Sequence, residues 1–245
     1  MTMDKPLTGK IPRDSIGLLE LPRLPDALLA AYRALGDLSG LVSDACDELG
    51  ITCGIPAAVL RPTDPKARIA GQALTALNRR LAIPVAEAVA TKVSRLGEIE
   101  AHNLAKDGDV LVIQGIEGIS SMGAISASIG KRQGELGAIV DGAVRDIDHQ
   151  RAIGYPVWSR GASPVTGKWR IQTMAINVPV RICGIEVNPG DLVVADEVGV
   201  CFVPFNRAAE VMEVVRKLVR YEEDRLAQVA AGVSVPDLAN AKRPK

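Results

Sequence analysis

Two short apolar runs separated by a glycine-rich segment constrain the fold most strongly. Residues 110–114 read VLVIQ and residues 136–142 read LGAIVDG. Continuous apolar runs of this length are typical of strands that are covered on both faces. The segment between them, residues 115–134, has the pattern of a glycine-rich turn that enters a helix. The strand, helix and second strand predict a βαβ unit, and with it an α/β protein that contains parallel strands.

Hydrophobic periodicity and turn residues predict the remaining elements. Residues 177–204 combine Val and Ile with the turn residues Asn188 to Asp191, which predicts a β-meander of three or four short strands. The other predictions are helices at 25–36, 39–50 (with Ser39 as a possible cap) and 85–106, a strand at 67–77, a short helix near 146–153, a strand at 155–161 and a long helix at 206–231.

The sequence contains no repeat, low-complexity tract or linker, so a single domain is expected. Within it we distinguish an N-terminal arm with the first helix (1–38), a core (39–205) and a C-terminal helix with its tail (206–245). The last helix carries apolar residues along one side. It therefore packs either on its own domain or on a neighbouring subunit.

Charge balance argues against nucleic acid and membranes as partners. Lys and Arg total 29, as do Asp and Glu, so no net field attracts a polyanion or an anionic lipid surface. No apolar run approaches the roughly 20 residues that span a bilayer, and a cytoplasmic protein is expected. The four cysteines show no C-x-x-C spacing and lie in apolar segments, which favours reduced, buried thiols over thiol chemistry or a zinc site.

A candidate anion site lies where the glycine-rich segment enters its helix. The backbone N–H groups of Gly123, Ala124, Ile125 and Ser126 could face a carboxylate or phosphate, because the first turn of a helix leaves such groups unpaired. Neither a Walker loop nor a G-x-G-x-x-G motif is present. Tight packing of the helix on a strand would explain the glycines equally well.

A second candidate follows the second apolar run. If that strand ends near Asp141 and Gly142 makes a turn, Arg145 and Asp146 project over the same end of the sheet as the first site. Arginine matches a carboxylate with two parallel donors, and a lone aspartate suits Mg²⁺ or Mn²⁺, which retain waters and substrate oxygens as ligands. The pair could grip a small keto acid. The alternative is an acidic residue at a helix start beside a solubilising arginine.

The chain has two histidines. His149 lies three residues after Asp146 and would share a helix face with it, where it could relay protons, hold a metal-bound water or simply be exposed. His102 has no partner that the sequence identifies and is expected to be structural.

These segments, in this order and spacing, resemble the RraA-like family, which includes 4-hydroxy-4-methyl-2-oxoglutarate aldolases. The similarity covers about residues 39–204, and its most specific parts are DGAVRD (141–146) and the block 178–204. The resemblance implies a swivelling ββα-type domain in homotrimers or homohexamers, with sites at subunit interfaces. It further implies a metal-dependent lyase that releases pyruvate from a 4-hydroxy-2-oxo acid, with oxaloacetate decarboxylation as a side activity.

Carried over by position, the resemblance implies that the amides of Gly123 to Ser126 hold the carboxylate of pyruvate. Arg145 then contacts the substrate, and Asp146 binds Mg²⁺ or Mn²⁺. For the mechanism we expect a metal-bound water, which His149 could position, to take the 4-hydroxyl proton.

The chain departs from the family pattern at two of these positions. Ala124 stands where an acidic residue is usual, and His149 stands where Glu or Asp is common; Glu117 could replace a missing carboxylate or be an ordinary loop acid. The alternative function is regulatory, because one family member inhibits ribonuclease E through protein contacts.

Overall fold

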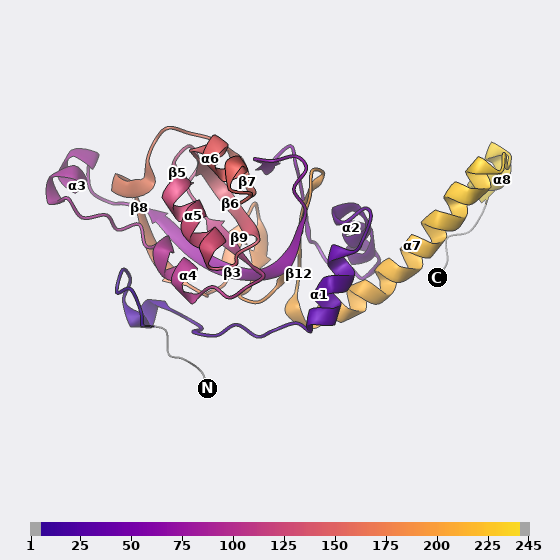
Figure 1. Cartoon of the computed structure of the whole chain (residues 1–245), viewed down its shortest axis with the longest axis horizontal. Coiled ribbons are helices and arrows are strands. Elements are labelled where there is room, and N and C mark those ends of the chain that lie inside the picture. The colour runs from indigo at the N-terminus through magenta and orange to yellow at the C-terminus, as the bar shows by residue number, and fades with distance from the viewer. Residues whose placement is uncertain (1–5, 241–245) are drawn as a thin grey trace.

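The computed structural model describes residues 6–240 and contains one large mixed sheet (Figure 1). Its strands follow the order β1-β12-β11-β3-β4-β6-β7-β2, while β5 pairs with β6 and β8 with β3. The strands are β1 Gly54–Pro56, β2 Arg61–Pro62, β3 Ile69–Arg80, β4 Asp109–Gln114, β5 Ser120–Met122, β6 Gly137–Val144, β7 Val157–Ala162, β8 Ile171–Ile176, β11 Leu192–Ala195 and β12 Gly199–Val203. Two further strands, β9 Val180–Ile182 and β10 Ile185–Val187, form a separate hairpin.

The predicted βαβ unit is confirmed. β4 and β6 are parallel neighbours, and helix α5 Ala124–Arg132 connects them. The parallel part of the sheet extends on both sides, because β3 pairs with β4 and β6 with β7 in the same direction. The meander is confirmed as four strands, although β9 and β10 leave the large sheet while β11 and β12 remain in it.

Apolar side chains alternate between the two faces of the sheet, as strand geometry requires. Leu111, Ile113 and Val140 lie on the face that helices α4 Glu98–Leu104 and α5 cover, and α6 Ile147–Ala152 follows β6 beside α5 (Figure 1). Val112 and Ile139 lie on the opposite face, in one apolar cluster with residues of the β9–β10 hairpin. The two layers place α4 and α5 beside the ends of β4 and β6, where the candidate residues are.

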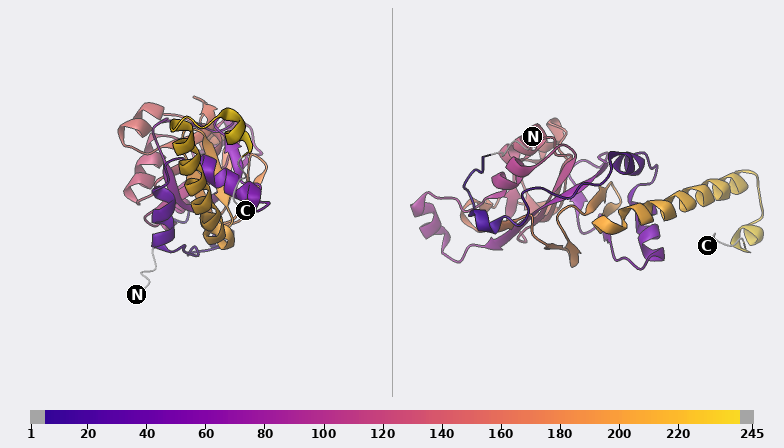
Figure 2. Two further views of the ribbon diagram at one scale, coloured as in Figure 1. Left: turned by 90° about the vertical axis from the view of Figure 1, so that its right-hand side faces the viewer. Right: turned by 90° about the horizontal axis from the view of Figure 1, so that it is seen from below.

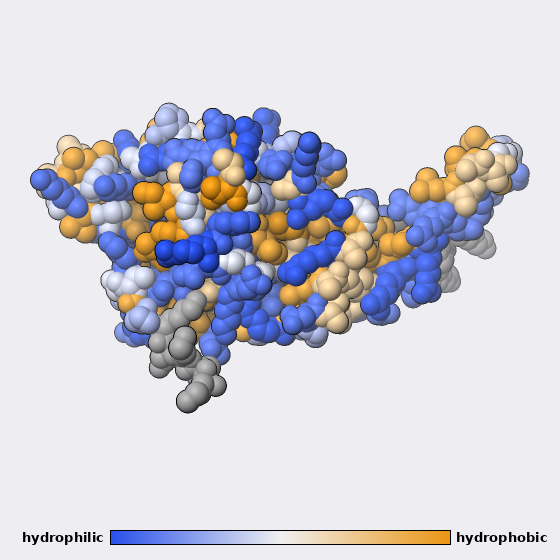
Figure 3. Space-filling view, viewed as in Figure 1, coloured by the Kyte–Doolittle hydropathy of each residue, from blue (hydrophilic) through white to orange (hydrophobic). Residues whose placement is uncertain are grey.

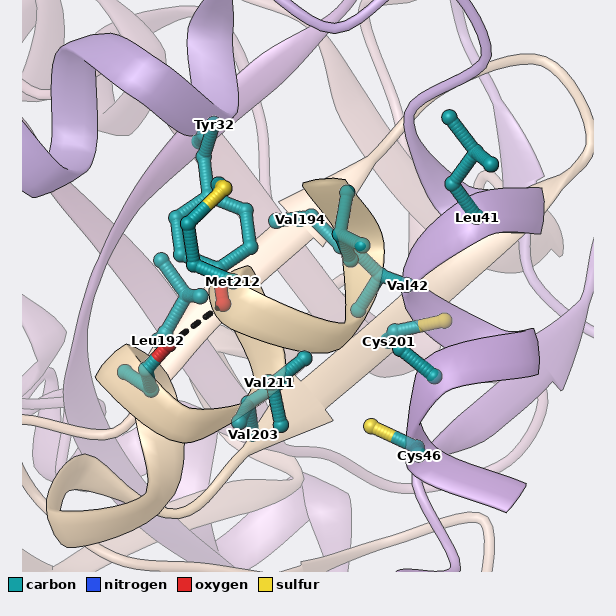
Figure 4. Packing of buried hydrophobic residues seen from close by; sticks show 14 of the residues in the cluster. Tyr32, Leu41, Val42, Cys46, Leu192, Val194, Cys201, Val203, Val211 and Met212 are labelled. Atoms are coloured by element: carbon teal, nitrogen blue, oxygen red, sulfur yellow. Dashed lines mark hydrogen bonds between the residues drawn. The ribbon is translucent and has the colours of Figure 1, made fainter. Parts of the chain in front are cut away.

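A second group of helices packs at the β11–β12 side of the sheet. Helices α1 Asp26–Arg33, α2 Ser39–Glu48 and α7 Ala208–Ala230 share one apolar cluster with these strands (Figure 4). α7 is buried only in its first half; its second half projects away from the sheet and is followed by α8 Val235–Asn240 (Figures 1 and 2). Leu226 on this half is 64% exposed, and apolar residues gather at the far end in Figure 3.

Three local predictions were wrong. The segment 85–106 forms two helices, α3 Val85–Thr91 and α4, because Lys92 adopts a left-handed backbone conformation that ends α3. Arg95 and Gly97, between the two helices, hydrogen-bond to Thr173 of β8 instead. β6 continues to Val144, so Gly142 lies inside the strand, where a Cβ would lie 3.0 Å from the Ile116 nitrogen. Ser39 does not cap its own helix, since its hydroxyl donates to Asp196.

Cys46, Cys53 and Cys201 are free and buried together in the α1–α2–α7 cluster, as the apolar sequence context predicted. Cys183 is also free but only half-buried, near Asp141. Over residues 6–240, no helix combines the length and the apolar composition needed to cross a membrane.

Candidate functional site

A cavity of about 310 Å³ lies where β6 ends and α5 begins. Gly123, Ala124, Ile125, Ser126, Arg145 and Asp146 all line it, so the structure brings the two predicted junctions together. Its other walls come from α4, the loop before it, β5, the short helix Gly167–Trp169 and the N-terminal arm. These walls are formed by Lys10, Ser94, Leu96, Glu98, Ile99, His102, Ser120, Ser121, Met122, Ile129, Thr166, Gly167 and Lys168.

The backbone at the end of β6 turns Asp146 toward the start of α5. Asp146 has a φ of 58°, a left-handed conformation in which asparagine and aspartate are found more often than other non-glycine residues, and α6 begins after it. Its Oδ2 accepts a hydrogen bond of 2.9 Å from the N–H of Ala124. The Arg145 Nε lies 3.7 Å from the same oxygen. The two neighbouring side chains therefore face one cavity rather than opposite sides of the chain.

Gly123 allows this approach. A Cβ at this position would lie 2.5 Å from Asp146 Oδ2, closer than non-bonded atoms allow. Because the φ of Gly123 is −145°, which any residue adopts, the requirement is for space and not for backbone conformation. The interpretation that this glycine permits tight packing is therefore correct, and the group that packs on it is the carboxylate of Asp146 at the start of α5.

The first turn of α5 has two N–H groups that no group within residues 6–240 accepts. The Ala124 N–H donates to Asp146, and the first bond within the helix runs from Ala127 N–H to the carbonyl of Gly123. The N–H groups of Ile125 and Ser126 consequently have no acceptor within the helix. With Arg145, Lys10 and Lys168 around the same cavity, they suit an anionic ligand.

The floor of the cavity contains a buried hydrogen-bonded chain that the sequence did not predict. The Ser126 hydroxyl lies 2.8 Å from His102 Nε2, and His102 Nδ1 lies 2.8 Å from Glu135 Oε1. Tyr155 donates to the other oxygen of Glu135 over 2.5 Å. His102, Glu135 and Tyr155 are at most 2% exposed.

Glu98 is a second residue that sequence reasoning missed. Its Oε2 is buried and has no hydrogen-bond partner among residues 6–240. Burial raises the pKa of this carboxyl to about 7, although a hydrogen bond with the backbone of Glu98 itself lowers it somewhat. The signal in the sequence was the spacing of Glu98 and His102, four residues apart on one helix face.

Two other candidates lie outside the cavity. His149 Nε2 is 2.8 Å from the hydroxyl of Ser128, in an adjoining hollow that Ala124 and Ile125 also border. Glu117 lines a different hollow with Asp141 and Arg160. The structure therefore does not bring Glu117 to the cavity as a replacement carboxylate.

Within residues 6–240, no three His, Cys, Asp or Glu side chains are close enough to form a metal cage. Asp146 is the predicted ligand, and a single carboxylate fits an ion that keeps most of its waters. Mg²⁺ usually binds in this way, with one or two carboxylates, water and substrate oxygens. Zinc, which takes four protein ligands in structural sites and three in catalytic ones, does not fit this donor set.

Comparison with known proteins identifies the family. The family model described as RraA-like, Aldolase/RraA, matches residues 40–202. The chain belongs to the RraA-like family. The fold agrees, since the crystal structure of Streptomyces coelicolor RraAS2, described as an unusual member of the RNase ES inhibitor RraA protein family, superposes with a TM-score of 0.68 at 26% identity. That match covers 83% of this chain and 98% of RraAS2.

Two curated relatives extend the comparison. Protein DlpA of Legionella pneumophila is 27% identical over 232 residues, which is 93% of this chain and 35% of DlpA. A Halalkalibacterium halodurans protein named "Putative 4-hydroxy-4-methyl-2-oxoglutarate aldolase" is 31% identical over 140 residues, which is 56% of this chain and 66% of that protein. The chain thus spans about a third of DlpA and just under two thirds of the second relative.

Proposed function

We propose that the protein is a divalent-metal-dependent lyase that cleaves a 4-hydroxy-2-oxo acid to release pyruvate and also decarboxylates oxaloacetate. One observation carries the proposal: Arg145, Asp146 and the free amides of α5 line the same cavity. An aldolase name among the family relatives supports it.

The residues of the cavity divide the binding task. The amides of Ile125 and Ser126 would hold the substrate carboxylate, with Lys10 and Lys168 adding positive charge at the walls. Asp146 would hold Mg²⁺ or Mn²⁺, which when bound supplies Lewis-acid polarisation of the 2-keto group. Gly123 leaves the space that the carboxylate of Asp146 occupies.

Arg145 would stabilise the negative charge that develops on the keto oxygen as the carbon–carbon bond breaks. A preorganised donor of this kind contributes about 2.7–4 kcal/mol to the transition state. Loss of carbon dioxide from oxaloacetate produces the same enolate but requires no base. Cleavage of a 4-hydroxy-2-oxo acid requires, in addition, a group that accepts the 4-hydroxyl proton. The sequence assigned that proton to a water positioned by His149, and this stays a prediction.

The test is release of pyruvate from oxaloacetate and from a panel of 4-hydroxy-2-oxo acids with Mg²⁺ or Mn²⁺, with and without chelator. Because free metal ions also decarboxylate oxaloacetate, the control is Asp146→Ala at the same metal concentration. Enzyme-dependent release that chelator abolishes is the expected result. No release above this control with any metal would contradict the proposal.

A second function rests on the likeness to RraAS2 and on the two missing family acids at Ala124 and His149. It is a regulatory role through contact with an endoribonuclease. An inert protein that slows RNA cleavage by purified RNase E would favour it. The Arg145–Asp146 pair in a cavity argues for the lyase, because a protein that acts only through its outer surface has no need of it.

The proposal also includes a homotrimer or homohexamer with sites at the subunit interfaces. The mass of the protein in solution tests this oligomeric state.

A further inference from the structure

The cavity floor carries a buried group that the proposed mechanism does not use. His102 lies between Ser126 and Glu135, with 2.8 Å from each ring nitrogen to its partner. Burying three polar side chains costs free energy unless every group is paired, and the pairing here is consecutive from Tyr155 to Ser126. This series of hydrogen bonds ends at the hydroxyl of Ser126, a residue that lines the cavity.

The direction of these hydrogen bonds follows from the buried end. Burial and the neighbouring carboxylate raise the pKa of Tyr155 well above its ordinary value, so Tyr155 keeps its proton and its hydroxyl donates a hydrogen bond to Glu135. Glu135 then accepts from His102 with its other oxygen, which places a proton on Nδ1. In the neutral imidazole the remaining nitrogen, Nε2, is an acceptor, and its partner is the hydroxyl of Ser126.

Gly130 makes this arrangement possible. A Cβ on this α5 residue would lie 2.4 Å from Glu135 Oε2 and 2.8 Å from the Tyr155 hydroxyl. The absence of a side chain lets the carboxylate and the phenol reach the helix from which Ser126 projects. The chain is thus built into the contact of α4 and α5.

We propose that Ser126, backed by His102 and Glu135, is the proton acceptor for the 4-hydroxyl group of the substrate. This inference rests on the proposed lyase function. Ser126 contacts substrate and is the catalytic residue, while His102 and Glu135 act through it. Ser126 lies two residues after Ala124, whose N–H donates to Asp146, so the acceptor lies on the same turn of α5 as the amide that holds the metal ligand.

The proton and electron changes balance without a further reactant. The substrate hydroxyl gives its proton to Ser126 Oγ as the Ser126 hydroxyl gives its own to His102 Nε2. The C4 oxygen forms a carbonyl, the C3–C4 bond breaks, and its electron pair passes into the enolate of pyruvate. Ser126 and His102 then return the proton to C3, which becomes the methyl group of pyruvate, and His102 is neutral again.

Helix α5 offers a matched control. Ser128, one half-turn further on, forms an equally short pair with His149, but that pair is exposed and lies in the adjoining hollow. Only the inner pair lines the cavity. The two serines therefore separate the inner relay from the role that the sequence predicted for His149.

The experiment compares two reactions in the same variants, with Mg²⁺ or Mn²⁺ present. Ser126→Ala and His102→Gln are expected to lower cleavage of a 4-hydroxy-2-oxo acid about 100-fold or more, which is the usual contribution of a general base. Decarboxylation of oxaloacetate removes no hydroxyl proton, so its loss in these variants should be much smaller than the loss of cleavage. Ser128→Ala, which changes a serine outside the cavity, should keep both reactions within about threefold of wild type. Circular dichroism reports whether each variant is folded. Ser126→Thr, which keeps a hydroxyl, should restore part of the cleavage.

Parallel loss of both reactions in Ser126→Ala would mean that the pair is structural and would overturn the proposal. Selective loss of cleavage in Ser128→Ala instead would assign the proton to the outer pair. A wild-type protein that performs neither reaction would refute the lyase function, and this inference with it.

A measurement without substrate or metal completes the test. The chain has only two histidines, so nitrogen chemical shifts of ¹⁵N-labelled imidazoles can be assigned to His102 and His149 with a His149→Gln sample. We expect His102 to carry its proton on Nδ1 at neutral pH. A proton on Nε2 would overturn the relay, because no lone pair would then face Ser126.

Discussion

The two helical groups that flank the sheet bury their polar side chains in different ways. Around α1, α2 and α7, the Tyr32 hydroxyl donates to the carbonyl of Ala208, and three thiols lie among aliphatic side chains. Figure 4 shows Tyr32 and two of these cysteines, Cys46 and Cys201. Around α4 and α5, the hydrogen-bonded series through His102 ends at a cavity, and a buried oxygen of Glu98 has no partner in the part of the chain that the structure describes. The first arrangement completes a core. The second buries polar side chains that lower the free energy of unfolding and do not improve packing, which is typical of a functional site.

The largest expected effect is loss of the metal site. Asp146→Ala should abolish metal-dependent release of pyruvate from oxaloacetate, because the cavity would lose its predicted metal ligand. The side chain is 42% exposed, so the fold should survive. Steady-state assays at several Mg²⁺ and Mn²⁺ concentrations measure the effect. Wild-type rates in this variant would show that Asp146 is not the metal ligand. They would also weaken the distinction between a functional site at α4 and α5 and a core at α1, α2 and α7.

Arg145→Ala should lower kcat/KM for oxaloacetate by about 100-fold or more, because a preorganised cation no longer faces the developing enolate. Arg145→Lys, which keeps the charge but not the two parallel donors, is expected to fall in between. A coupled pyruvate assay gives both values. Little loss in the alanine variant would show that Arg145 does not contact the substrate.

Glu98→Gln should change how stability depends on pH. The folded protein holds the Glu98 proton up to a pKa of about 7, against 4.5 ordinarily. A carboxyl whose pKa is raised by folding contributes its full stability at a pH below its pKa in the unfolded chain. That contribution is lost as the pH rises through the folded pKa of about 7. The difference between the two pKa values corresponds to about 3 kcal/mol of unfolding free energy.

Urea unfolding of wild type and Glu98→Gln between pH 4 and 8 measures this. The variant should gain stability relative to wild type as the pH rises, since glutamine carries no charge to bury. If the difference in unfolding free energy between the two proteins stays the same from pH 4 to 8, Glu98 ionises normally and is hydrated in the cavity.

The smallest effect should come from the other helical group. Tyr32→Phe removes one buried hydrogen bond to Ala208 and should cost about 1 kcal/mol of unfolding free energy. Oxaloacetate decarboxylation should be unaffected. A change in kcat would mean that the α1–α2–α7 group acts on the cavity, and the two regions could no longer be treated as separate.

Local patterns predicted the parts of the site that are local in the chain. Strand β6 surfaces at Arg145 and Asp146, and α5 begins after Gly123, so a reading of strand ends and helix starts finds both. His102 could not be interpreted in this way. Its carboxylate partner is 33 residues away in the chain, and the tyrosine behind that carboxylate lies 20 residues further on. No periodicity relates such positions.

The sequence by itself determined the βαβ unit, the long last helix and the family, because these depend on hydrophobic spacing and on motifs a few residues long. Tertiary structure alone decided which buried polar groups join the predicted residues at the cavity. It placed Glu98 and His102 in the lining of the cavity that Arg145 also lines, and His149 in the neighbouring hollow. The reason is physical: hydrogen-bond partners and desolvation depend on distance in space, and packing of α4 against α5 sets that distance.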